Sequence, residues 1–270
     1  MKALISNIFG KLGYNISRKS KSSAFSELGE KVGFEFEDYA RDAINVVRRQ
    51  TMLPYMSLIT LYEQVVFIEK TGIPGDFVEC GVWKGGAVGL MALANLKWNE
   101  SRRNLHLFDA FEEICAPDEK VDGQVAINEV KNKLGKDALT KGELKPLKGI
   151  YDDFGGPGNL SECSNLIENV IGYPPDKVFY HKGWFQNTVP ADKQNIKSIA
   201  ILRLDGDWYD STKVCIENLY DKVVPGGFVI FDDYGLYEGC KKAVDEFFES
   251  RKESHFLNYT TRACRYFRKI

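Results

Sequence analysis

The feature that most constrains the fold is an alternation of short apolar β-type runs with helical segments, which begins after Gly72, Pro74 and Gly75. Parallel strands need a crossover connection, usually a helix, so this order predicts an α/β fold: a mostly parallel sheet with helices on both faces. Residues 255–269 alternate like an antiparallel hairpin. The expected strands are DFVEC (76–80), LHLFD (105–109), KVFYH (177–181), SIAILRLD (198–205) and GFVIFDD (227–233), and the expected helices are 86–98, 211–222 and 240–251.

The chain before these runs is predicted to be helical. Residues 36–72 have helical character and are interrupted at Pro54, which ends or kinks a helix. We interpret them as a helical cap on one domain that spans residues 36–270. Within this domain, residues 110–160 are long for a connection, and loops of that length are often lids or binding loops.

Residues 1–35 are predicted to form an amphipathic N-terminal helix followed by a linker. Leu4, Ile5 and Ile8 fall at helical spacing, with Lys2 and Lys11 beside them. Two interpretations stay open for this helix: peripheral contact with a membrane surface, or capping a neighbouring subunit and fraying in solution. No run is long enough to span a bilayer.

Charge and cysteine usage exclude some classes of partner and compartment. The net charge of −2 provides no basic field for binding nucleic acid phosphates, so no nucleic-acid partner is expected. The six cysteines are scattered, without C-x-x-C spacing and without a metal-ligand pattern with the three histidines. This usage predicts a reducing compartment, and we expect the protein to be cytoplasmic.

A glycine-rich loop follows the first expected strand. The strand contains Glu79, and glycines follow at 81, 85 and 86, where a backbone can approach a ligand at the start of a helix. Glu79 would repel a pyrophosphate but could pair with a cationic amino-acid group, which favours S-adenosylmethionine over a dinucleotide. Asp109, at the end of the second strand, is placed to accept hydrogen bonds from ribose hydroxyls. A purely structural turn is the alternative for the loop alone.

Two later strands end in pairs of aspartates. Asp205 and Asp207 follow one strand, and Asp232 and Asp233 follow the next. If both strands end at the same edge of the sheet, these four carboxylates converge. Like charges so close repel, with only Arg203 and Lys213 basic nearby in sequence, and a hard divalent cation would relieve the repulsion. The alternative is that each pair caps the helix that follows it.

These residues carry a resemblance to a known family. The segments TGIPGDFVECGVWKGGA (71–87), KGWFQNTVP (182–190), LRLDGDWYDST (202–212) and PGGFVIFDDY (225–234) resemble the macrocin O-methyltransferase family, as does Thr51-Met52. Members of that family methylate sugar hydroxyls on antibiotics. The resemblance runs from about residue 50 to 250, and it implies a Rossmann-like class I methyltransferase fold.

The resemblance also implies a set of site residues. Magnesium, or another divalent cation, would be bound by Asp205, Asp232 and Asp233, and the catalytic base would be Asp207. The residues expected to contact S-adenosylmethionine are Thr51, Met52, Glu79, Gly81, Val82, Gly85, Asp109, Phe111 and Asp205.

Further residues have both a functional and a structural interpretation. His181, at the end of the third expected strand, is a second candidate base or a structural hydrogen bonder. Trp184 and Phe185 either wall the cofactor pocket or pack in the core. The family usually has D-S-F-x-G-L-P after the second strand, and this sequence departs from it with Asp109-Ala-Phe-Glu-Glu-Ile-Cys, which leaves the contacts of that loop open.

The predicted function is divalent-metal-dependent methylation of a hydroxyl on a sugar or glycosylated metabolite. A vicinal diol would suit two adjacent positions on the metal, which lowers the pKa of the bound hydroxyl. Free, nucleotide-linked and lipid-linked sugars are all compatible with the sequence. Two alternatives are a catechol or polyketide O-methyltransferase and a non-catalytic module that retains the fold. We also expect self-association into a homo-oligomer.

Overall fold

The computed structural model describes residues 29–139 and 143–270. The predicted N-terminal helix lies outside these residues. At the centre is a seven-stranded sheet of order β3-β2-β1-β4-β5-β7-β6, with β7 antiparallel to both of its neighbours and the other four pairings parallel. The strands are β1 (Asp76–Cys80), β2 (Leu105–Asp109), β3 (Val178–Lys182), β4 (Ile199–Leu204), β5 (Val223–Phe231), β6 (Asn258–Tyr259) and β7 (Arg265–Arg268).

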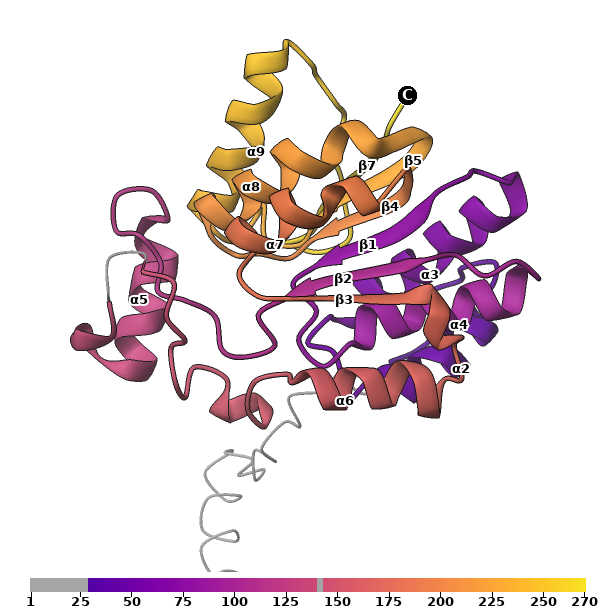
Figure 1. Cartoon of the computed structure of the whole chain (residues 1–270), viewed down its shortest axis with the longest axis horizontal. Coiled ribbons are helices and arrows are strands. Elements are labelled where there is room, and N and C mark those ends of the chain that lie inside the picture. Colours follow the sequence, from indigo (N-terminus) through magenta and orange to yellow (C-terminus); the bar gives the residue numbers. More distant parts are fainter. Residues whose placement is uncertain (1–28, 140–142) are drawn as a thin grey trace, which may run out of the picture.

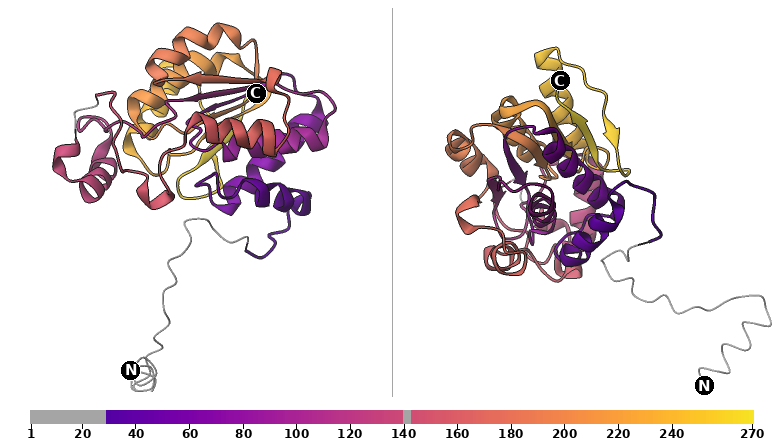
Figure 2. Two further views of the ribbon diagram at one scale, coloured as in Figure 1. Left: turned by 60° about the horizontal axis from the view of Figure 1, so that its bottom comes forward. Right: turned by 90° about the vertical axis from the view of Figure 1, so that its right-hand side faces the viewer.

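Helices cover both faces of the sheet, as Figures 1 and 2 show. One layer contains α2, α3, α4 and α6, and the other contains α7, α8 and α9 (Figure 1). Each layer buries its own apolar cluster against the sheet. The helices are α2 (Glu37–Val47), α3 (Tyr55–Thr71), α4 (Gly86–Trp98), α5 (Gly123–Leu134), α6 (Leu160–Ser164), α7 (Phe185–Asp192), α8 (Tyr209–Leu219) and α9 (Glu238–Arg251).

The predicted fold is confirmed. The mostly parallel sheet and the C-terminal antiparallel pair are both present, and the expected strands match the observed ones closely. Pro54 is the N-cap of α3 and separates it from α2, because a proline has no N–H with which to continue the hydrogen bonds of a preceding helix. The helix expected at 211–222 begins two residues earlier, at Tyr209.

The segment 110–160 differs from the long loop that the sequence predicted. It contains α5, which stands apart from the sheet in Figure 1. The helix belongs to a small lobe with an apolar cluster of its own, made by Ala116, Val130, Leu147 and Ile150. A helix forms here because this cluster buries one of its faces, which a connection without secondary structure could not do.

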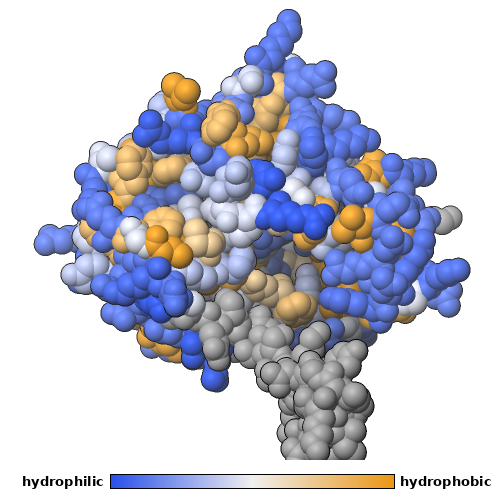
Figure 3. Space-filling model, turned by 180° about the vertical axis from the view of Figure 1, so that it is seen from behind, coloured by the Kyte–Doolittle hydropathy of each residue, from blue (hydrophilic) through white to orange (hydrophobic). Residues whose placement is uncertain are grey.

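None of the helices in residues 29–139 and 143–270 combines the length and the apolar character needed to cross a bilayer. The face opposite to that of Figure 1 is predominantly hydrophilic, with scattered hydrophobic residues (Figure 3).

Candidate active site

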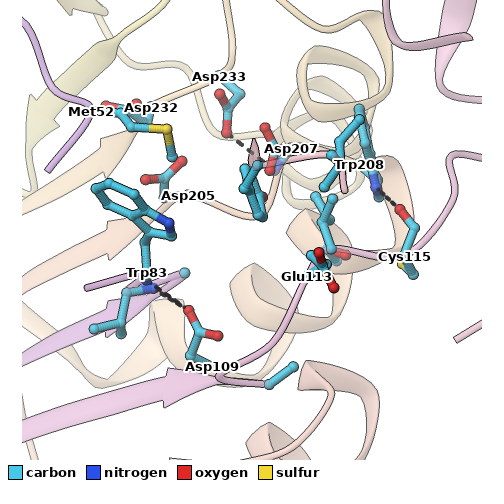
Figure 4. A pocket seen from close by; sticks show the side chains of 18 of the residues that line it. Met52, Trp83, Asp109, Glu113, Cys115, Asp205, Asp207, Trp208, Asp232 and Asp233 are labelled. Atoms are coloured by element: carbon cyan, nitrogen blue, oxygen red, sulfur yellow. Dashed lines mark hydrogen bonds between the residues drawn. The ribbon is translucent and has the colours of Figure 1, made fainter. Parts of the chain in front are cut away.

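A cavity of about 330 Å³ lies where the parallel strands end. Carboxyl ends of β1, β2, β4 and β5 supply its floor, which is the usual ligand position in an open α/β sheet. Residues 50–54 and parts of the 110–160 segment supply its walls. Figure 4 shows aspartates from three of these strand ends directed into the same space.

The glycine loop brings the end of β1 against the end of β4. Gly81 has a φ of +91°, and a Cβ at this position would lie 1.8 Å from the carbonyl oxygen of Asp205. The backbone N–H of Asp205 donates to the carbonyl of Cys80 at 2.8 Å, which fixes this close approach. Only glycine fits the space and conformation of residue 81 without strain.

Asp109 holds the loop that follows β1. Its carboxylate accepts the backbone N–H groups of Val82 at 2.6 Å and Trp83 at 2.9 Å through Oδ2, and that of Phe111 at 2.6 Å through Oδ1. Burial raises the pKa of Asp109, and these three hydrogen bonds oppose that effect. Asp109 also lines the cavity, and its carboxylate has acceptor capacity left beyond these three hydrogen bonds.

A buried arginine, Arg203, connects Glu79 of β1 to two of the aspartates. Arg203 Nη1 lies 2.7 Å from Glu79 Oε1 and 2.8 Å from Asp205 Oδ2, and Nη2 lies 3.0 Å from Asp232 Oδ1. Burial raises the pKa of Glu79 to about 8 although Arg203 lowers it. Glu79 Oε2 is buried and has no hydrogen-bond partner among the described residues, which is the environment expected of a group that awaits a cationic ligand.

Four aspartates meet beside this arginine. Ligand oxygens of Asp205, Asp232 and Asp233 lie within 4.8 Å of one another. The backbone N–H of Asp207 donates to Asp233 Oδ2 at 3.1 Å, so Asp207 is held against the same group. Burial raises the pKa of Asp232 to about 6 and raises that of Asp233 and of Asp207 further, with neighbouring carboxylates adding to the effect.

The alternative role of these aspartates as helix caps finds no support. The N-cap residues of α8 and α9 are Trp208 and Tyr237, and neither helix start receives a side-chain cap from its own N-cap residue. The first N–H of α8, from Tyr209, is instead bonded to Asp122 of the α5 lobe at 2.6 Å. Carboxylates that do not cap helices remain available for a ligand.

Most of the residues singled out in the sequence line the cavity. Trp184 and Phe185 contribute to its wall, as one of the two interpretations held. Arg203 supplies the compensating charge, whereas Lys213 donates to the Tyr209 hydroxyl and does not line the cavity. The predicted residues among the lining are Thr51, Met52, Glu79, Gly81, Val82, Asp109, Asp205, Asp207, Asp232 and Asp233.

Three predicted site residues lie outside the lining. Gly85 is the N-cap of α4, and Phe111 is buried in the core, where it packs on Tyr180. Both shape the site without facing it. His181 is stacked on Phe108, and its ring nitrogens are 3.1 Å from His106 Nδ1 and 2.9 Å from Asp192 Oδ2.

The placement of His181 corrects the expectation that it is a second candidate base. Burial lowers the pKa of His181, whereas its hydrogen bond to Asp192 raises it, and the side chain does not line the cavity. With both nitrogens occupied by protein groups, the imidazole has no free position from which to accept a proton from a substrate. The structural interpretation of His181 is the one that the geometry favours.

Several lining residues were not predicted. Glu113, Glu129, Tyr151 and Phe154 come from the 110–160 segment, and their side chains had no motif to identify them. Trp83 was part of the quoted glycine loop but was given no role. Its φ of +49° is unusual for a residue with a side chain, and that strain is a signal only the structure shows.

Comparison with known proteins decides the family. The model described as macrocin-O-methyltransferase (TylF) matches residues 19–141 and 169–269. The chain belongs to the macrocin O-methyltransferase family. Membership confirms the prediction that the chain is an S-adenosylmethionine-dependent O-methyltransferase.

Relatives in the macrocin O-methyltransferase family have named substrates. The chain is 32% identical over 200 residues to the 8-demethyl-8-(2,3-dimethoxy-α-L-rhamnosyl)-tetracenomycin-C 4'-O-methyltransferase of Streptomyces olivaceus, covering 73% of this chain and 67% of the relative. It is 32% identical over 235 residues to the demethyldecarbamoylnovobiocin O-methyltransferase of Streptomyces niveus, covering 85% and 77%.

A solved structure agrees with this assignment. The O-methyltransferase NovP superimposes with a TM-score of 0.64 at 29% identity and covers 82% of each chain. The calicheamicin methyltransferase CalS11, with a TM-score of 0.53 at 17% identity over 94% of this chain and 99% of that one, shows the same fold.

Proposed function

We propose that this protein transfers the methyl group of S-adenosylmethionine to a hydroxyl of a sugar carried by a small molecule, with a divalent cation held by Asp205, Asp232 and Asp233. The observation that carries this proposal is the convergence of four aspartates on the cavity that the glycine loop also lines. The family supplies the reaction class, and the geometry supports the site.

The donor set fits a hard cation. Three carboxylates with oxygens within 4.8 Å of one another are the ligands that magnesium and calcium prefer over thiolates and imidazoles. Arg203 neutralises only part of their charge, because it is shared with Glu79. A bound divalent cation would supply Lewis acidity toward an acceptor hydroxyl, which is a poor nucleophile at neutral pH.

The protein's own groups would position the reactants. Asp109 and the free oxygen of Glu79 would bind the ribose and the amino group of the cofactor at one end of the cavity. During transfer, the acceptor oxygen forms a bond to the methyl carbon as the sulfur–carbon bond breaks, which gives a methyl ether and S-adenosylhomocysteine. Asp207 would take the proton that the hydroxyl loses, since it lies beside Asp233 in the cavity.

The acceptor is proposed from the relatives and from the walls of the cavity. The two relatives described above act on a rhamnosyl-tetracenomycin and on a novobiocin precursor. Aromatic side chains suited to stacking on a sugar face line the cavity here, among them Trp184, Trp208 and Tyr237. A sugar with two adjacent hydroxyls is therefore the proposed acceptor, and self-association stays a prediction from the sequence.

The decisive test measures binding and turnover separately. Calorimetry with S-adenosylhomocysteine should give a micromolar dissociation constant for the wild type and much weaker binding for Asp109→Ala. Methyl transfer from labelled S-adenosylmethionine to a panel of glycosides should require magnesium and stop in EDTA. Transfer that continues unchanged in EDTA would contradict the metal, and folded wild type that binds no cofactor would contradict the whole proposal.

A further inference from the structure

We call the glycine loop after β1, residues 81–86, the cofactor loop, and its side chains connect it to the far wall of the cavity. We define the acceptor wall as residues 150–158, which begin in the α5 lobe and contribute Ile150, Tyr151 and Phe154 to the cavity. The indole Nε1 of Trp83 donates to the carbonyl of Gly156 at 3.2 Å. Lys84 Nζ donates to the carbonyl of Gly155 at 3.1 Å.

The contact is close as well as polar. A Cβ on Gly158 would lie 2.0 Å from the carbonyl oxygen of Trp83, so the two backbones touch at this point. Lys84 Nζ lies 4.6 Å from the centre of the Trp83 ring, a cation–π distance that holds both arms together. Two consecutive residues of the cofactor loop thus grip three glycines of the acceptor wall.

The same loop is fixed from the other side by the group expected to bind the ribose. The backbone N–H of Trp83 donates to Asp109 Oδ2, which also accepts the N–H of Val82. Trp83 has a left-handed backbone, and such a conformation persists only where its surroundings hold it. A ligand on Asp109 therefore acts on Trp83 directly, and through the indole on Gly156.

The wall carries a residue at the reacting end of the cavity. Tyr151 is partly buried and lines the cavity, where the loss of solvent raises its pKa well above the usual value, with contributions from the charges of Asp207 and Asp109. Tyr151 therefore lies within electrostatic reach of Asp207, the proposed base, and of Asp109, the residue expected to bind the ribose. Displacement of the wall would move Tyr151 and open this part of the cavity to water.

We propose that Trp83 and Lys84 are positioning residues that clasp the acceptor wall to the cofactor loop, so that cofactor binding orders the wall before the acceptor enters. The coupling rests on the proposed function, because it needs the cofactor on Asp109. The link from Asp109 through Trp83 to Gly156 is contiguous, and a ligand that rigidifies one end lowers the cost of ordering the other.

Amide hydrogen exchange of the acceptor wall measures directly whether cofactor binding orders it. The N–H groups of Phe154, Gly155 and Gly156 are bonded within the wall, so their exchange reports its opening. In the wild type, saturating S-adenosylhomocysteine should slow their exchange by about tenfold, the effect of roughly one hydrogen bond from a charged donor. In Lys84→Met the slowing should fall below about twofold, while calorimetry gives an unchanged affinity for the cofactor product.

Matched variants separate the clasp from a general loss of charge or fold. Lys145→Met removes one positive charge from the 110–160 segment, where Lys145 pairs locally with Glu143, and should behave as the wild type. Lys84→Arg keeps the donors and should restore protection, whereas Gly158→Ala should break the contact from the wall side.

Two results would overturn the clasp: equal protection in Lys84→Met and wild type, or equal loss in Lys84→Met and Lys145→Met. A wild type that binds no S-adenosylhomocysteine contradicts the proposed function instead. In that event the ligand-free exchange of the wall still decides the clasp, because Lys84→Met should speed it and Lys145→Met should not.

Discussion

Asp207 has a left-handed backbone, with a φ of +56°, between a glycine and a tryptophan that packs in the α5 side of the cavity. Asparagine and aspartate tolerate this conformation better than other residues with side chains. Asp207→Asn therefore removes the proton acceptor while keeping the backbone. We expect kcat to fall by about 10²- to 10⁴-fold, with affinity for S-adenosylhomocysteine unchanged by calorimetry.

The pH profile gives the same variant a second measurement. Burial and the neighbouring carboxylates raise the pKa of Asp207, so the group is neutral below that pKa and accepts a proton only above it. Wild-type kcat/KM should accordingly rise with pH, and the residual activity of Asp207→Asn should not follow that rise. His181→Asn is the matched control, and a loss of kcat as large as that of Asp207→Asn would contradict the assignment of the base.

The effect of a side chain at Gly81 on stability can be separated from the effect of backbone strain by comparison with Gly72. Gly81 and Gly72 both have positive φ, but only at Gly81 would a Cβ meet another backbone, at 1.8 Å, whereas nothing lies within 4 Å of one at Gly72. Gly72→Ala should cost about 1 kcal/mol in urea unfolding. Gly81→Ala should cost at least about 3 kcal/mol, or abolish folding. Equal costs would show that β1 and β4 separate easily there.

For single residues, the sequence identified the chemical groups of the site better than the contacts that those groups make. Aspartates at strand ends and glycines after β1 could be placed because strand direction and the edge of the sheet follow from the strand–helix order. Arg203 could be named as a nearby positive charge but not as the group that Glu79 and two aspartates share. Its contact with Glu79 joins residues 124 positions apart, which the sequence alone does not bring together. The two roles of His181 could not be separated from the sequence because its partners, His106 and Asp192, are on other elements.

Helix α2 is held at its start by a carboxylate of its own first turn. Glu37 accepts the backbone N–H groups of Val32, Gly33 and Phe34 and the hydroxyl of Tyr55. Although burial by itself would raise the pKa of Glu37, these hydrogen bonds lower it to about 2. Glu37→Gln should therefore lower the urea midpoint at pH 7.

The pH dependence of that difference follows from the sign of the shift. The folded pKa, about 2, is below the ordinary value of 4.5, so the stabilisation is complete above pH 4.5 and is lost as the pH falls toward 2. Urea unfolding of wild type and Glu37→Gln should converge over that range. A difference that stays constant from pH 7 to 3 would show that the carboxylate charge is not what holds the 32–34 turn.

Helices α5, α6 and α7 were not among the predicted elements, and α5 shows why. The sequence GQVAINEVKNKL places Ala126, Ile127 and Val130 on one helical face, and all three are buried in α5. That signal was present but was outweighed by the surrounding polar residues. The sequence could not show that the α5 lobe contacts α8. That contact includes the hydrogen bond from the N–H of Tyr209 to Asp122, which lies 87 residues earlier.

The charge of the cavity differs sharply from that of the molecule. The whole chain has a net charge of −2, yet nine carboxylates and only two cations, Lys133 and Arg203, line the cavity. The raised pKa values of Glu79, Asp207 and Asp233 reduce the charge that these acids carry, but the remaining carboxylates still outnumber the two protein cations. A cleft of one sign concentrates ligands of the other sign and repels its own.

This field distinguishes acceptors that the sequence left equivalent. A neutral or amine-bearing glycoside enters without electrostatic cost, whereas a sugar linked to a diphosphate brings like charge into the cavity, which costs several kcal/mol. We expect kcat/KM for a nucleoside-diphosphate sugar to be at least about 100-fold below that for the methyl glycoside of the same sugar. Salt should narrow the gap, because ions screen the repulsion.

Substitution of Glu113 tests whether the negative charge of the cavity discriminates against phosphate-linked sugars. It lies in the cavity near Asp207 and Trp208 (Figure 4), and one of its oxygens is bonded to the backbone of Gly149. Glu113→Gln keeps the shape and removes one charge, so it should raise kcat/KM for the phosphate-linked sugar and leave that for the glycoside nearly unchanged. A wild type that prefers the nucleotide-linked sugar at low salt would mean that the diphosphate stays outside the cavity, where these nine carboxylates do not reach it.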